Sequence, residues 1–200
     1  MSEGLAKDIL RRQAAIFKNI EQESIDVYIF LHREAQKGDV AQDNVFQFVF
    51  RSFYRLDSAG LGPKIKKKYF RLLGKKCQDL KIILEKLHEI KTLRNLNTVQ
   101  FSFATKLLHT LDPRNPIYDS KVALATHIHT GGNTPESRIQ SCMEKYEELR
   151  QIHATLLKNV GIQRVISRFR NKFKVSSQVI PNVKIVDFLL WSLGSLRERR

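Results

Sequence analysis

The residues best placed for chemistry lie in the segment 112–119 (DPRNPIYD), which ends in Asp119. Pro113 and Pro116 lack a backbone N–H and push the residues before them out of the α-helical conformation, so they end one helix and form a rigid turn. Asp119 then precedes an apolar helical pattern, where an aspartate caps a helix N-terminus. Backbone N–H groups and the helix dipole keep such a carboxylate ionised. The sequence leaves both roles open for Asp119, a structural cap or a reactive carboxylate.

Two predicted helices must position this aspartate. The helix before the turn is predicted over residues 98–111, because apolar side chains recur there at helical spacing (Phe101, Phe103, Ala104, Leu107, Leu108 and Leu111). The helix after the turn is predicted over residues 119–130.

The rest of the chain has the same helical periodicity, which predicts an all-α protein. Further helices are expected at 5–18, 22–37, 45–56, 62–73, 77–93, 134–158, 161–173 and 183–194. The 45–56 segment is apolar on almost all sides and is predicted to be a central buried helix, while its aromatic run also suits a strand. Trp191 is expected in the core. The 200 residues (1–200) are predicted to form a single helical unit, with a lobe boundary near 130–134.

The charge of the chain points to a polyanionic partner. It holds 35 Lys and Arg against 20 Asp and Glu, a formal net charge of +15, which favours nucleic acid first and an anionic membrane surface second. The excess is concentrated in residues 61–91, with a net charge of +7, and in residues 160–178, with +5. The side chains predicted to grip phosphates are Lys64, Lys66, Lys67, Lys68, Arg71, Arg164, Arg168, Arg170, Lys172 and Lys174. A solvated surface with no partner is the other interpretation of these charges.

The segment 96–122 resembles the helix-hairpin-helix DNA glycosylase superfamily. In that family a glycine-containing hairpin approaches a DNA phosphate, and an aspartate opening the next helix activates the nucleophile or stabilises the sugar cation. The apolar hairpin positions are matched by Leu96, Val99 and Ala104, and the stretch ending in the aspartate is matched by 117–119, with Val122 continuing its helix.

The family's pattern is not complete in this chain. Its proline and two glycines are replaced by Asn97, Thr98 and Gln100, and Ser102 stands where a lyase lysine would be, with Lys106 one turn later. The resemblance therefore implies a monofunctional glycosylase-like protein, without a lysine at the lyase position, that recognises or excises a base in DNA. Duplex DNA is the expected partner and Asp119 the catalytic residue. The alternative is a non-enzymatic basic helical adaptor that binds RNA or an acidic protein.

No metal or small-molecule cofactor is expected. His127 and His129 lie near a loop, with His109 not far away in sequence, but no acid or cysteine flanks them at ligand spacing. Cys77 and Cys142 lack CxxC spacing and are predicted to be buried thiols in a reducing compartment. No signal peptide and no apolar run of membrane-spanning length is visible, so the expected location is cytoplasmic, and nucleoid-associated or nuclear if the protein binds DNA.

Overall fold

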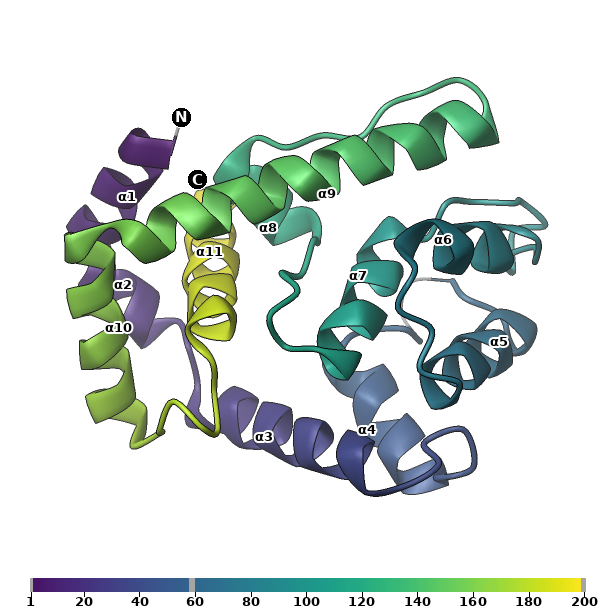
Figure 1. Cartoon of the computed structure of the whole chain (residues 1–200), viewed down its shortest axis with the longest axis horizontal. Coiled ribbons are helices and arrows are strands. Elements are labelled where there is room, and N and C mark those ends of the chain that lie inside the picture. The colour runs from purple at the N-terminus through teal and green to yellow at the C-terminus, as the bar shows by residue number, and fades with distance from the viewer. Residues whose placement is uncertain (1, 58–59, 199–200) are drawn as a thin grey trace. The chain divides into compact units, whose positions relative to one another are not determined.

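The computed structural model describes residues 2–57 and 60–198, and all regular secondary structure in this part of the chain is helical (Figure 1). The all-α prediction is therefore confirmed. The helices are α1 (Ser2–Arg11), α2 (Gln13–Lys18), α3 (Gln22–Lys37), α4 (Asn44–Phe53), α5 (Pro63–Gly74), α6 (Leu80–His88), α7 (Phe101–Leu111), α8 (Ser120–Thr126), α9 (Pro135–Lys158), α10 (Val160–Phe173) and α11 (Asn182–Glu198).

Several helix ends differ from the prediction for local reasons. The predicted helix 5–18 is interrupted at Arg12, which separates α1 from α2. Helix α6 is shorter than the predicted 77–93, because Asp79 caps its N-terminus by accepting a hydrogen bond from the N–H of Ile82. Helix α8 ends four residues before the predicted position, because His127 adopts a left-handed conformation with φ 58°.

The predictions of burial for α4 and Trp191 were wrong. The 45–56 segment is a helix and not a strand, but of its apolar residues only Phe46 and Phe50 are buried within α4. Val45 is 66% exposed and Phe48 is 65% exposed, so the helix buries one face only. Trp191 is 40% exposed, because its position on α11 places it on the edge of an otherwise buried helix.

Internal contacts divide the chain into two units. Unit 1 comprises Met1–Ile25, Pro113–His129 and Glu144–Arg200, and unit 2 comprises Asp26–Asp112 and Thr130–Met143. Helices α3 and α9 each contribute residues to both units.

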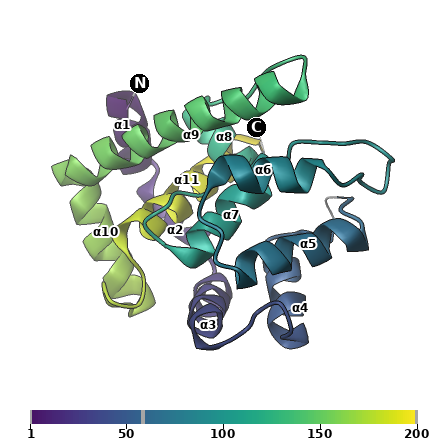
Figure 2. The same ribbon diagram turned by 45° about the vertical axis from the view of Figure 1, so that its right-hand side comes forward.

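In unit 1, α8 packs closely against α11, as Figures 1 and 2 both show. The approach depends on Gly194 of α11, where an added Cβ would lie only 1.9 Å from the carbonyl oxygen of Lys121 in α8. Helix α11 buries Ile185, Leu189 and Leu193 completely, so it forms the centre of the unit 1 core. This packing fixes the start of α8, where Asp119 lies.

In unit 2, aromatic side chains of α4 and α5 form much of the core. Phe50 is fully buried, and its ring centroid lies 4.6 Å from that of Tyr54, 5.7 Å from that of Tyr69 and 5.6 Å from that of Phe70. Helix α6 packs against both α5 and α7. The aromatic core leaves the charged residues of α5 on its outer surface.

Candidate functional site

Asp119 caps the N-terminus of α8, as the sequence predicts. Its Oδ1 accepts hydrogen bonds from the backbone N–H groups of Lys121 and Val122, both at 2.9 Å. The residue itself has an extended backbone, with φ −149° and ψ −179°, which is typical of an N-cap. The two hydrogen bonds satisfy backbone donors at the start of α8 that have no partner within the helix.

The cap uses only one of the two carboxylate oxygens of Asp119. Within the described part of the chain, Oδ2 accepts no hydrogen bond, and the side chain is half-buried. The capping role and a chemical role are therefore compatible in this geometry. Oδ1 fixes the orientation of the group, and Oδ2 remains able to face a cation or a water molecule.

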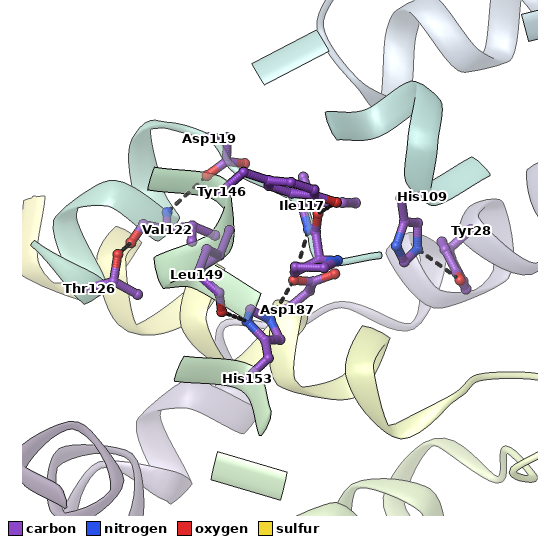
Figure 3. Close-up of polar contacts among 11 residues, drawn as sticks. Tyr28, His109, Ile117, Asp119, Val122, Thr126, Tyr146, Leu149, His153 and Asp187 are labelled. Carbon is purple, nitrogen blue, oxygen red and sulfur yellow. Dashed lines mark hydrogen bonds and ion pairs between the residues drawn. The ribbon is translucent and has the colours of Figure 1, made fainter. Parts of the chain in front are cut away.

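The turn before Asp119 is held by hydrogen bonds from α9 and α11, all within unit 1 (Figure 3). The N–H of Ile117 donates to Oδ1 of Asp187 at 3.2 Å, and the hydroxyl of Tyr146 donates to the carbonyl of Pro116 at 3.2 Å. The hydroxyl of Tyr118 donates to the carbonyl of Ile128 at 3.2 Å. Three consecutive residues are thus anchored, which limits the movement of the carboxylate that follows them.

Asp187 is itself part of a buried pair with His153. Both side chains are 3% exposed, and Nε2 of His153 lies 2.9 Å from Oδ1 of Asp187. Nδ1 of His153 lies 3.0 Å from the carbonyl of Leu149, and a carbonyl can only accept, so Nδ1 must carry a proton. Nε2 of His153 and Oδ1 of Asp187 therefore share a buried hydrogen bond, and the same Oδ1 accepts from the N–H of Ile117.

Lys184 adds a buried cation to the same part of unit 1. It is 5% exposed, and its Nζ lies 4.5 Å from the centroid of the Phe188 ring. Burial lowers the pKa of Lys184 below its usual value, and the carboxylates of Asp187 and Asp119 oppose that shift. Asp119 therefore lies within the electrostatic range of a buried ammonium group.

Sequence reasoning missed His153, Lys184 and Asp187 as components of this site. Asp187 is 70 residues from Ile117 and 34 residues from His153, so no local motif joins them. The available signal was the presence of a lysine and an aspartate within the otherwise apolar stretch VKIVDFLL of α11. Charged residues in such a stretch are rarely buried unless they are paired.

The predicted basic residues of α5 belong to unit 2 and differ in their surroundings. Lys66 forms an ion pair with Asp57 at 2.7 Å, and Lys68 interacts electrostatically with Glu89. Lys64, Lys67 and Arg71 are exposed. Within the described residues, none of these three has an ion-pair partner.

Two hollows border this surface of unit 2. The first, of about 510 Å³, is lined by the end of α3, the turn after it, the end of α5 and the two residues that follow α5, Lys75 and Lys76. The second, of about 720 Å³, is lined by that turn, α4 and the beginning of α5. Arg71 and Ala41 line both, so the hollows adjoin.

Seven cationic side chains line the two hollows together: Lys37, Arg51, Lys66, Lys67, Arg71, Lys75 and Lys76. The one acid among the lining residues is Asp39, whose Oδ1 accepts from the N–H of Ala41. Lys67, Arg71, Lys75 and Lys76 have no ion-pair partner in the described part of the chain, and we call these four the basic cluster. Lys75 and Lys76 were not among the predicted binding residues, although their place in the same charged segment was a signal for them.

The predicted basic residues of α10 contact other parts of unit 1. Arg168 donates to Oε1 of Gln13 at 2.9 Å, and Lys172 donates to the carbonyl of Phe17. Arg170 donates to the carbonyl of Ile180 at 2.9 Å and to Oδ1 of Asn182 at 2.7 Å, and burial lowers the pKa of Arg170. Arg164 and Lys174 remain exposed and make no such bond among the described residues. Three of these five cations are therefore hydrogen-bonded within the protein, which makes α10 a weaker candidate than α5 for contacts with phosphates.

Lys106 lies in unit 2 and is buried. Its Nζ donates to Oγ of Ser102 at 3.0 Å and lies 4.8 Å from the centroid of the Phe103 ring.

The described histidines and cysteines do not gather into a metal site. Nε2 of His109 lies 3.1 Å from the hydroxyl of Tyr28 in unit 2, a contact that Figure 3 also draws, and His127 contacts Arg197 in unit 1. No group of three or more His, Cys, Asp or Glu side chains that could hold a metal ion occurs in residues 2–57 and 60–198. Cys142 is buried, as predicted, and burial raises its pKa to about 11, whereas Cys77 is only half-buried.

Comparisons of the chain with protein families, with characterised proteins and with solved structures gave no match. Of the helices in the described part of the chain, none combines the length and apolarity that a membrane span requires. The function must therefore be argued from the residues of this chain alone.

Proposed function

We propose that this protein binds nucleic acid, with DNA as the first candidate, and that the basic cluster on α5 contacts the phosphates. The observation that carries the proposal is that Lys67, Arg71, Lys75 and Lys76 line two adjoining hollows without an acidic partner among the described residues. Protein surfaces that bind nucleic acid gain most of their affinity from such cations, because each phosphate that they neutralise releases condensed counterions.

The arrangement of charge on α5 is costly in the absence of an anion. Helix α5 has no acid in its first turn and no side-chain cap, yet Lys64, Lys66 and Lys67 lie close to its N-terminus. Cations at that end are repelled by the helix dipole and by one another. A bound phosphate would relieve both repulsions, which gives this charge pattern a physical reason.

We further propose that the protein is glycosylase-like, with Asp119 as its catalytic carboxylate. A carboxyl group held by two backbone N–H groups, with its second oxygen unbonded within the described structure, suits the stabilisation of a sugar cation or the orientation of a water molecule. The anchored turn before Asp119 would keep this oxygen in place during the reaction.

Binding should be measured by fluorescence anisotropy with labelled duplex DNA, plain or holding an abasic-site analogue. A variant with the basic cluster neutralised (Lys67→Gln, Arg71→Gln, Lys75→Gln and Lys76→Gln) is expected to lose most of its affinity for both duplexes. The matched control neutralises four exposed lysines elsewhere (Lys7, Lys18, Lys81 and Lys158) and lowers the net charge equally. Equal weakening in both variants would refute a role for the basic cluster beyond its contribution to net charge.

Preference for the abasic analogue tests the glycosylase-like part of the proposal. We expect the wild-type protein to bind the analogue duplex more tightly than the plain duplex, because an abasic site resembles the product of base removal. Equal binding would contradict this part and leave a protein that contacts only the nucleic-acid backbone. If neither duplex is bound even at low salt, the partner would instead be RNA or an acidic protein.

A further inference from the structure

An exposed aromatic side chain lies on α4, one of the helices that line the second hollow of unit 2. Two of the exposed large hydrophobic side chains in the described structure are aromatic. Phe48 lies in unit 2, and Trp191 lies in unit 1. Phe48 is 65% exposed, although most of the neighbouring aromatic rings are buried in the core. A ring exposed to this extent is available for contact with a ligand.

Phe48 does not itself line the second hollow, but its neighbours on α4 do. Gln47 and Arg51 of α4 line this hollow together with Lys67 and Arg71 of α5. Phe48 follows Gln47 and precedes Arg51 by three positions, so it lies on the adjacent strip of the helix surface. Val45 lies three positions before Phe48 and is also exposed, which extends the apolar surface by one turn.

Arg51 connects the apolar and the charged parts of this surface. Its Nε donates to the carbonyl of Gln47 at 3.2 Å, and its guanidinium lies 3.8 Å from Asp57. Arg51 therefore lines the hollow at a position one helical turn after Phe48. A planar aromatic ring beside a row of cations matches the chemistry of an unstacked nucleotide, which has a flat base at one end and a phosphate at the other.

We infer that Phe48, with Val45 beside it, is a stacking platform for an unpaired base whose strand runs along the basic cluster. The preferred ligand is therefore single-stranded nucleic acid, or a duplex with an unpaired base. This inference rests on the proposed nucleic-acid binding and names the form of nucleic acid that the surface selects. Charge complementarity favours this occupant over an apolar protein partner, because the four cations of the basic cluster line the adjoining hollows without an ion-pair partner among the described residues.

The test compares a labelled single-stranded oligonucleotide with its duplex, using anisotropy at one fixed salt concentration. Phe48→Ala is expected to weaken single-strand binding by about 5- to 150-fold, the range that loss of one base–aromatic stack produces. Binding to the fully paired duplex should change by less than about twofold, because its bases are already stacked. Since Phe48 is mostly exposed, the variant should fold, and circular dichroism checks this. Val160→Ala, at an exposed apolar position of unit 1, is the matched control and should leave both affinities unchanged.

A second variant reports stacking directly. Phe48→Trp in a Trp191→Phe background has one tryptophan, and its fluorescence should be quenched by the single strand and not by the duplex. If the wild-type protein binds no nucleic acid, the proposed function itself fails. If it binds nucleic acid and Phe48→Ala has no selective effect on the single strand, only the stacking inference is overturned. Concentration-dependent dimerisation that Phe48→Ala abolishes would also overturn it, in favour of self-association.

Discussion

The two roles of Asp119 can be separated by a pair of substitutions. Asparagine keeps an oxygen that can accept the hydrogen bonds from the N–H groups of Lys121 and Val122, and its amide nitrogen would take the place of Oδ2. Alanine removes both acceptors. Asp119→Asn should therefore preserve the cap and remove the charged oxygen, while Asp119→Ala removes the cap and the charge together.

The expected magnitudes follow from this geometry. Loss of the carboxylate charge at the start of α8 costs about 0.3–1 kcal/mol in either variant. Loss of the N-cap hydrogen bonds costs Asp119→Ala about 1 kcal/mol more. For a chain of this length, each kcal/mol lowers the melting temperature by about 2–4 °C, so the alanine variant should melt about 2–4 °C below the asparagine variant.

Thermal unfolding followed by circular dichroism measures the cap, and release of a base from DNA followed by strand scission in alkali measures the chemistry. Asp119→Asn should melt about 1–4 °C below the wild type and, if the wild type excises a base as proposed, should lose that activity. If both variants melt at the same temperature, Asp119 does not stabilise α8 in the way its hydrogen bonds indicate. If Asp119→Asn still excises a base at the wild-type rate, the carboxylate is not catalytic.

Three further predictions concern packing and buried charge in unit 1. Gly194→Ala should lower the free energy of unfolding by about 3 kcal/mol, because its Cβ would overlap the α8 backbone. The control Gly4→Ala adds a Cβ that meets nothing within 4 Å, so it should be neutral or slightly stabilising. Denaturant unfolding of the two variants measures the difference. Lys184 has a lowered pKa, so it binds its proton less readily in the folded state than in the unfolded state. The stability of the wild type should therefore increase relative to that of Lys184→Met as pH rises through the lowered pKa towards 10.5. An unchanged difference in stability between pH 7 and pH 10 would contradict this prediction. Asp187→Ala leaves His153 and the N–H of Ile117 buried without their shared partner and should cost about 1–3 kcal/mol for each group left unsatisfied, measured by urea unfolding at neutral pH. A total cost below about 1 kcal/mol would contradict the role of these hydrogen bonds.

The parts of the fold that the sequence predicts are those with local causes. Prolines, capping aspartates and helical periodicity act within a few residues, and they indicated most of the helices and the cap at Asp119. The C-terminal ends of helices were predicted less accurately. Helix α8 ends where His127 adopts a left-handed conformation, which the sequence did not indicate, so α8 was predicted too long. The helix predicted over 161–173 is observed as α10, with its recurring apolar residues Ile166 and Phe169 buried.

The parts that the sequence does not predict depend on residues far apart in the chain. The cations of α10 were predicted to contact phosphates, but Arg168 donates a hydrogen bond to Gln13, which lies 155 positions away in the sequence. The pairing of His153 with Asp187 likewise follows from tertiary packing. Burial of α4 was overestimated because an apolar sequence shows which faces could be buried and not which face has a neighbour. Each of the two units is made of segments that are separate in the sequence, so the division cannot be predicted from the composition.

The central claim, that the basic cluster binds phosphates, is tested most directly by the salt dependence of binding. The logarithm of the association constant should fall linearly with the logarithm of the salt concentration, with a slope of about 0.9 for each phosphate contacted in a duplex. Neutralising the basic cluster should make this slope shallower by about 2 to 4, while the control variant at Lys7, Lys18, Lys81 and Lys158 should keep the wild-type slope. An unchanged slope in the basic-cluster variant, or the same reduction in both, would contradict the account.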